Sequence, residues 1–159
     1  MNPRELLIDT IAYMPPGKAL QGLAPDQAER RVAGANHSIA EIVAHLSFWQ
    51  DWFLRRLEGE AEPMVRTAAQ GWPEVPRGSW PDIEKRFLSG LERAVALGGS
   101  DGRPDRVISP AIEFPPLARY TVRDALVHIA SHNGHHLGQA IALRQVLGLW
   151  PPPSGSWTW

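Results

Sequence analysis

Apolar residues recur at helical spacing in four stretches of the chain, and segments rich in proline and glycine separate these stretches. Residues 3–14, 38–58, 80–97 and 122–148 each place apolar side chains three or four positions apart, as one face of an α-helix requires. No stretch shows the period-two alternation of a half-buried strand. We therefore predict an all-α fold, a four-helix bundle with long connections after the second and third helices.

Residues at the ends of the predicted helices support these boundaries. Ser38 with Glu41, and Thr121 with Asp124, have the spacing of a capping box, in which each side chain accepts a hydrogen bond from the other residue's backbone N–H. Gly59 follows the second helix and is expected to end it. The first helix is expected to end or kink at prolines 15 and 16, and the segment after them to resume helix, with a short further turn starting at proline 25.

The connections between the helices are long. Residues 59–78 and 100–120 contain many prolines and glycines, and long ordered loops in compact domains are often functional. The connections are long enough to permit crossovers, so the topology of the bundle stays open. The tail after residue 148 begins with prolines, and its tryptophans predict that it packs against the rest of the chain.

The fourth predicted helix carries four of the six histidines. With Gln139, they fall within an arc of about 100° on the helix surface. A neighbouring arc is expected to face the core: Leu126, Ile129, Ala130, Leu137, Ile141 and Val146. His132 and His136 are four residues apart, so their rings lie one above the other and can reach one metal ion.

Composition narrows the functional classes. The 159 residues, 43% of them hydrophobic, suffice for a single globular domain over 1–159. The chain lacks cysteine, which excludes disulfides, thiolate metal sites and cysteine nucleophiles. A net charge of −1 gives no indication of nucleic-acid binding. Because there is neither a secretory signal nor an apolar run of the roughly 20 residues that span a membrane, we expect a cytoplasmic protein.

A third histidine could complete a metal site. His45 is the only histidine inside another predicted helix, at the border between the apolar stripe and solvent. His45, His132 and His136 would give the three-ligand set of an open catalytic site for one divalent metal ion, with zinc or nickel expected. Spacing alone leaves the register open, because His128 with His132, and His132 with His135, are also neighbours on the helix.

Other residues are candidates for a pocket beside this site. His128, His135 and Gln139 on the fourth helix could orient a ligand or line the pocket, as could three residues around His45 on the second helix: Glu41, Trp49 and Trp52. The dipeptide at residues 71–72 could contribute an apolar wall. His37 is expected to be a solvent-exposed or capping residue. No catalytic acid or base is assigned.

Two segments resemble the DinB-like (DinB/YfiT-like) family of metal-dependent helical bundles. They are SIAEIVAHL at 38–46 and HIASHNGHHLGQ at 128–139, in which one histidine follows a short apolar run and two histidines four apart precede Gly-Gln. The resemblance implies a four-helix bundle, often a homodimer, with one divalent metal held by three histidines. It matches His45, His132 and His136 to the metal positions and leaves His128 and His135 outside the ligand set.

The family resemblance also implies an activity. Relatives include transferases and isomerases that use low-molecular-weight thiols, so we expect a metal-dependent enzyme acting on a small molecule, by thiol transfer or metal-assisted hydrolysis. Two alternatives stay open at this point. One is a non-catalytic metal-binding or stress-response bundle, and the other is a plain dimeric bundle whose histidines lie on its surface.

Overall fold

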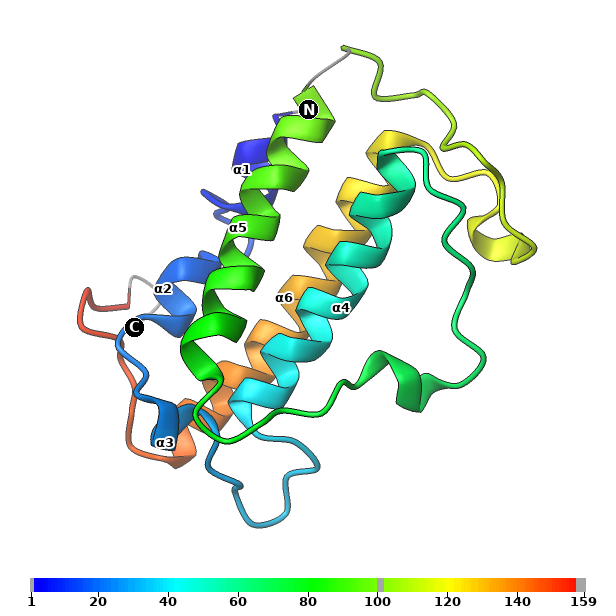
Figure 1. Ribbon diagram of the computed structural model, residues 1–159. Coiled ribbons are helices and arrows are strands. Elements are labelled where there is room, and N and C mark those ends of the chain that lie inside the picture. The colour runs from blue at the N-terminus through cyan, green and yellow to red at the C-terminus, as the bar shows by residue number, and fades with distance from the viewer. Residues whose placement is uncertain (1, 100–101, 157–159) are drawn as a thin grey trace.

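Three long helices form the body of the molecule in the computed structural model, which describes residues 2–99 and 102–156. They are α4 (Ile39–Leu57), α5 (Trp80–Gly99) and α6 (Val122–Val146), and α4 packs against both of the others (Figure 1). The described residues form no strand, and only an isolated bridge pairs Val107 with Thr121. The predicted all-α class is confirmed.

Capping boxes begin α4 and α6, as the sequence predicts. Ser38 Oγ accepts a hydrogen bond from the Glu41 backbone N–H at 3.2 Å, and a carboxylate oxygen of Glu41 accepts one from the Ser38 N–H at 2.7 Å. Thr121 and Asp124 make the same reciprocal pair. Each such cap stabilises its helix by about 1 kcal/mol. Gly59 follows the C-cap of α4 and has φ +95°, the left-handed conformation that glycine adopts without strain, so the helix ends here.

The first predicted helix is shorter in the structure than the range 3–14. Helix α1 ends at Leu7 (Pro3–Leu7), and α2 (Pro16–Leu20) begins only after the two prolines. Between them, Thr10 Oγ1 accepts a hydrogen bond from the Ala12 N–H, a local turn that competes with the helical backbone. These two short helices pack on α5 and α6, where a four-helix bundle would place one continuous helix. Helix α3 (Pro25–Ala28) is the short turn expected at proline 25.

The apolar core lies between the three long helices. The predicted stripe of α4 is buried, and so are the predicted core positions of α6 up to Leu137. Ile141 is half-buried. Val146 was expected in the core, but its side chain is 69% exposed. At about 100° per residue it lies about 180° around α6 from buried Leu137, so it points away from the core.

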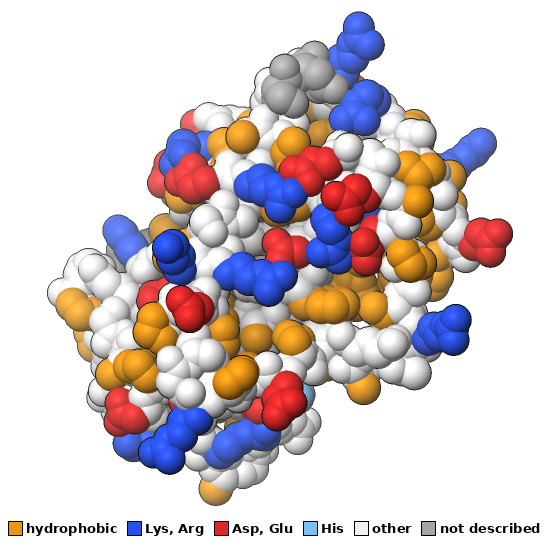
Figure 2. All heavy atoms as spheres, in the orientation of Figure 1, with side chains coloured by type: hydrophobic (Ala, Val, Ile, Leu, Met, Phe, Trp, Pro, Cys, Tyr) orange, Lys and Arg blue, Asp and Glu red, His pale blue; other side chains and the backbone are white. Residues whose placement is uncertain are grey.

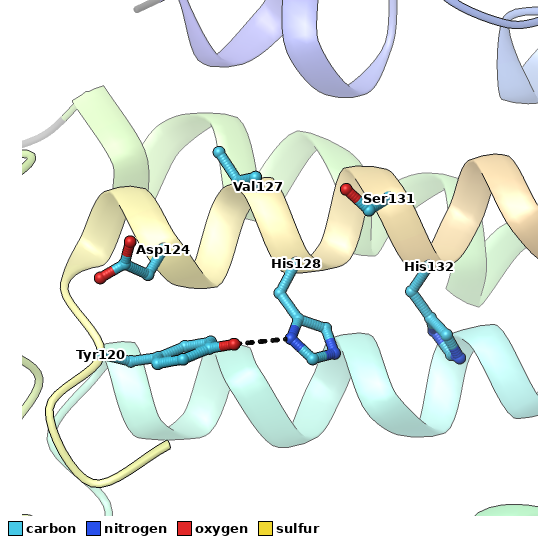
Figure 3. A pocket seen from close by; sticks show the side chains of 6 residues that line it. All are labelled: Tyr120, Asp124, Val127, His128, Ser131 and His132. Carbon is cyan, nitrogen blue, oxygen red and sulfur yellow. Dashed lines mark hydrogen bonds between the residues drawn. The ribbon is translucent and has the colours of Figure 1, made fainter. Parts of the chain in front are cut away.

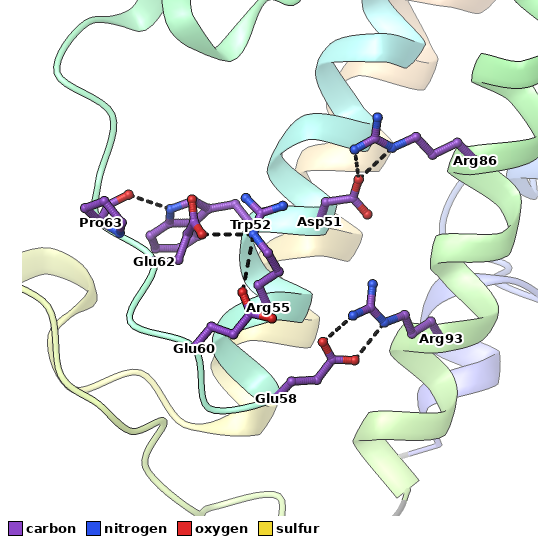
Figure 4. A network of polar contacts seen from close by, with 9 residues as sticks. All are labelled: Asp51, Trp52, Arg55, Glu58, Glu60, Glu62, Pro63, Arg86 and Arg93. Atoms are coloured by element: carbon purple, nitrogen blue, oxygen red, sulfur yellow. Dashed lines mark hydrogen bonds and ion pairs between the residues drawn. The ribbon is translucent and has the colours of Figure 1, made fainter.

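Helices α4 and α5 approach each other closely and are joined by ion pairs at their edge. A Cβ on Gly90 would lie 2.1 Å from Nε2 of buried Gln50, so a side chain at residue 90 would displace the Gln50 amide, which donates to the Phe87 carbonyl. Figure 4 shows the ion pairs, and two of them cross between the helices: Asp51–Arg86 and Glu58–Arg93. On the face shown in Figure 2, positive and negative side chains are interspersed, so this face carries no patch of one sign.

The connections and the tail fold back onto the helices. Residues 59–78 contain the 3-10 turn Ala68–Gly71, and residues 102–120 contain a second one, Pro115–Leu117. The tail packs near α2, since Ser154 N–H donates to the Gln21 side chain. The tryptophans of the last three residues, which were also expected to pack, lie outside the described residues. Within the described ranges, no helix has the length and apolar character needed to cross a membrane.

Candidate metal centre

Three histidines from two helices converge on one point. His45 comes from the middle of α4, and His132 and His136 come from successive turns of α6, which packs against α4. The ring centroids are separated by 5.0 Å for His45–His132, 4.7 Å for His45–His136 and 4.6 Å for His132–His136. One nitrogen from each ring lies within 4.8 Å of the other two. The structure therefore brings together the three histidines that the sequence selects, and it leaves His128 and His135 outside the cluster.

A backbone carbonyl fixes the orientation of the His45 ring. The Gly71 oxygen lies 2.6 Å from His45 Nδ1, and because a carbonyl only accepts, His45 must carry its proton on Nδ1. Its Nε2 then presents a lone pair, which points toward His132 Nε2 at 3.2 Å. An acceptor that holds the outer nitrogen of an imidazole is the usual partner of a metal-ligating histidine.

His136 has a similar partner. Its Nδ1 lies 2.7 Å from the side-chain oxygen of Gln139, one turn later on α6. The structure places the Gln139 amide with its oxygen toward His136 and its nitrogen 3.3 Å from His135 Nε2. His136 Nδ1 is therefore the protonated nitrogen, and Nε2 is free to act as a ligand.

The cluster fits a divalent cation. A zinc ion with ligand nitrogens at 2.0–2.1 Å in tetrahedral geometry would hold two of them about 3.3 Å apart, which matches the 3.2 Å between His45 Nε2 and His132 Nε2. Among the described residues, the hydrogen-bond partner of His45 Nε2 is His132 Nε2, which would carry the proton if no cation were bound. Three imidazole nitrogens without a carboxylate are a donor set suited to zinc, nickel, copper or iron.

Burial keeps these imidazoles in the neutral form that binds metal. Desolvation, together with the neighbouring imidazoles, lowers the pKa of His45 to about 4 and that of His132 to about 3. Burial also lowers the pKa of His136. At neutral pH, protons therefore compete weakly with a metal for these nitrogens.

The long connection between α4 and α5 builds one wall of the centre. Trp72 stacks on His45 with 3.9 Å between ring centroids, and His37 stacks on the other face of Trp72 at 3.7 Å. The connection can pack this closely on α4 because residue 71 is glycine: a Cβ there would lie 2.8 Å from Nε1 of Trp49. His37, expected at a cap or in solvent, is thus the outer layer of a stack that covers His45. No local sequence pattern indicates this contact.

A cavity of about 480 Å³ opens beside His132. Figure 3 shows His128 and His132 projecting from α6 toward α4, with the Tyr120 hydroxyl directed at His128 from the side. The remaining lining residues are Asp124, Val127 and Ser131. Sequence reasoning missed Tyr120, which lies in a connection without periodicity, but it did select His128 as a pocket residue.

The other residues predicted to line a pocket do not line this cavity. His135 is exposed and touches Gln139 and His136. Trp49 packs under Gly71, whereas Trp52 is buried in the core and donates its N–H to the Pro63 carbonyl. Glu41 is engaged in its capping box and in an ion pair with Arg31. None of these three residues of α4 lines the cavity beside His132.

Comparison with known proteins identifies one family. The family model described as the DinB superfamily matches residues 17–140, which is more than half of the chain and includes all three clustered histidines. A search of curated proteins gave no match.

Proposed function

The chain belongs to the DinB superfamily, and from that premise we propose that it is a divalent-metal-dependent enzyme acting on a small molecule. The observation that carries the proposal is the 3.2 Å separation of His45 Nε2 and His132 Nε2, with Nδ1 of His45 held by a carbonyl. Zinc and nickel are the ions we propose, because three neutral imidazoles suit both. Three protein ligands leave room for a water or a substrate atom on the ion.

A bound divalent cation would supply Lewis acidity, which lowers the pKa of a water or thiol so that a nucleophile exists at neutral pH. The residues of the chain supply the rest. Gly71 and Gln139 hold two imidazoles in the ligating tautomer, and Trp72 excludes water from the face of His45 that it covers. The cavity beside His132 gives a small molecule access to the same centre.

Two reaction classes are consistent with this arrangement. In the first, a low-molecular-weight thiol is the nucleophile and is transferred to an electrophilic substrate, as the family resemblance implies. In the second, water is the nucleophile and the reaction is a hydrolysis. Assays of thiol consumption with an added electrophile, and of ester hydrolysis, both with and without chelator, distinguish these classes.

Both reaction classes require a bound metal ion, so the metal content of the purified protein tests them together. We expect protein purified without a histidine tag to hold about one equivalent of divalent metal, and His132→Ala to lose it. His135→Ala is the matched control, because His135 is exposed and lies outside the cluster. Equal metal content in wild type and His132→Ala would overturn the proposal.

A further inference from the structure

The cavity beside His132 contains a polar pair that the metal centre does not use. The Tyr120 hydroxyl lies 3.2 Å from His128 Nδ1, and the two residues belong to different segments, the second long connection and α6. Phe53 of α4 supports both rings, stacking on Tyr120 with a 13° interplanar angle and contacting His128 with 4.8 Å between centroids. The orientation of His128 is therefore fixed by an aromatic wall and by a hydrogen bond.

The chemistry of the pair determines which nitrogen of His128 carries a proton. A phenol is a stronger donor than a neutral imidazole N–H, and an imidazole nitrogen is a stronger acceptor than a phenol oxygen. Tyr120 O–H therefore donates to His128 Nδ1, and the proton of the ring lies on Nε2. Figure 3 shows this second nitrogen on the side of the ring that faces His132. Among the described residues, no group accepts a hydrogen bond from it.

We propose that His128 Nε2–H is a substrate-binding donor for the carbonyl oxygen of a neutral small molecule, and that Tyr120 is the positioning residue that holds His128 in this tautomer. The proposal rests on the proposed function, because it places the carbonyl beside the metal-bound nucleophile. The ring centroids of His128 and His132 are 6.4 Å apart, so a compact ligand can touch His128 and the metal centre together.

The charge around the cavity favours a neutral ligand. Asp124 lines the same cavity, and its carboxylate accepts hydrogen bonds from the backbone and the hydroxyl of Thr121. These bonds hold the pKa of Asp124 below its ordinary value, so the group is negative at neutral pH and repels an anionic ligand. No Lys or Arg lines this cavity in the described part of the chain to offset that charge.

Three thiol probes of one length test the proposal on the cobalt-substituted protein. The probes are 3-mercaptopropionamide, its apolar isostere 3-methyl-1-butanethiol, and 3-mercaptopropionate. The thiolate-to-cobalt absorption band reports a dissociation constant for each. We expect the amide to bind wild type about fivefold more tightly than the isostere, the value of one neutral hydrogen bond. Equal affinities for the amide and its isostere would overturn the proposal. Tighter binding of the carboxylate than of the amide would overturn its restriction to neutral ligands.

Variants of His128 and Tyr120 test whether this pair causes the preference for the amide. His128→Phe keeps the aromatic contact with Phe53 but should abolish the preference for the amide, and His128→Gln, which retains an N–H donor, should restore part of it. Tyr120→Phe should weaken the preference, whereas a merely structural role would shift the melting temperature and affect both probes equally. A preference that persists in His128→Phe contradicts the assignment. Absence of cobalt binding in wild type would instead refute the proposed function itself.

Discussion

Trp72 and His45 stack face to face, with 3.9 Å between ring centroids and 12° between the ring planes. The residue before Trp72 supplies the carbonyl that His45 Nδ1 contacts, so one dipeptide of the long connection both covers and orients the first histidine of the cluster. A loop distant from α6 in sequence thus completes a centre whose other two members lie on α6. The geometry of the centre therefore depends on how residues 59–78 fold.

Substitution of Gly71 tests this dependence. We expect Gly71→Ala to lower metal affinity about 10- to 100-fold, because its Cβ would lie 2.8 Å from Nε1 of Trp49 and displace the carbonyl that holds His45. Competition with a chromophoric chelator measures the affinity. Trp49→Phe in the same chain should recover part of the loss by removing the indole nitrogen.

Gly138→Ala is the matched control for Gly71→Ala. Gly138 lies on α6, and a Cβ there meets no atom within 4 Å, so this variant should bind metal as wild type does and should gain up to about 1 kcal/mol in helix stability. If both alanine variants bind metal like wild type, the Gly71 carbonyl does not position His45.

Gln139 provides an independent test on the opposite side of the cluster. Gln139→Leu removes the acceptor of His136 Nδ1–H and should lower metal affinity about 10-fold or more. Gln139→Glu keeps an acceptor and should bind metal at least as tightly as wild type. Gln145→Leu, an exposed glutamine on the same helix, is the control, and the same chelator competition ranks the variants. Equal affinity in the Leu and Glu variants would exclude this role.

Local patterns sufficed to predict the long helices, but they did not select which histidines form the cluster. The capping boxes at Ser38 and Thr121 and the apolar periodicity are properties of adjacent residues, so α4, α5 and α6 could be located from sequence. Histidine spacing alone left several registers open. The family resemblance selected His45, His132 and His136, and these are the three that the structure brings together.

Features that depend on contacts between distant segments were not predictable in this way. Helix α1 ends at Leu7 because a side-chain turn and two prolines outweigh the apolar spacing that continues to Met14. Trp72 reaches His45 through a connection without periodicity, and Tyr120 reaches His128 in the same manner. Capping and periodicity carry no information on where such connections return to the bundle.

The stability of the metal-free protein should fall in acid. The unfolded chain binds protons on its histidines near pH 6.5, whereas the folded pKa is about 4 for His45 and about 3 for His132. The stability is therefore fully present above pH 6.5 and decreases as the pH falls toward these folded values. Between pH 7 and pH 5 we expect a loss of about 1–2 kcal/mol for each of these two residues, measured by urea unfolding with chelator present.

A neutral substitution isolates the contribution of one histidine to this acid effect. His132→Gln should reduce the dependence of the unfolding free energy on pH between 7 and 5, because it removes one group that the unfolded chain protonates. Saturating zinc should steepen the dependence in wild type, since protons then also compete with the bound metal. A metal-free wild type whose stability is unchanged between pH 7 and 5 would show that these imidazoles are not desolvated in solution.

Two buried arginines should respond in opposite ways to removal of their charge. Arg144 is 2% exposed and donates to the carbonyls of Ala19, Gln21 and Leu149, which join α2 and the end of α6. Arg56 is 1% exposed, but it donates only to the Pro110 carbonyl, and its Nε and Nη1 lack partners among the described residues. Each guanidinium also lies over a tryptophan ring, so the two sites differ mainly in hydrogen bonding.

We expect Arg144→Met to destabilise the protein by about 3 kcal/mol, because it leaves buried carbonyls without donors. Arg56→Met should be within about 1 kcal/mol of wild type or more stable, because it removes a buried cation whose desolvation is poorly compensated. Burial lowers the pKa of both guanidiniums, in agreement with this desolvation. Urea unfolding of the two variants at pH 7 gives the comparison. A large loss in Arg56→Met would mean that an acceptor absent from the described residues, such as a bound anion, satisfies Arg56, and added sulfate should then stabilise wild type but not the variant.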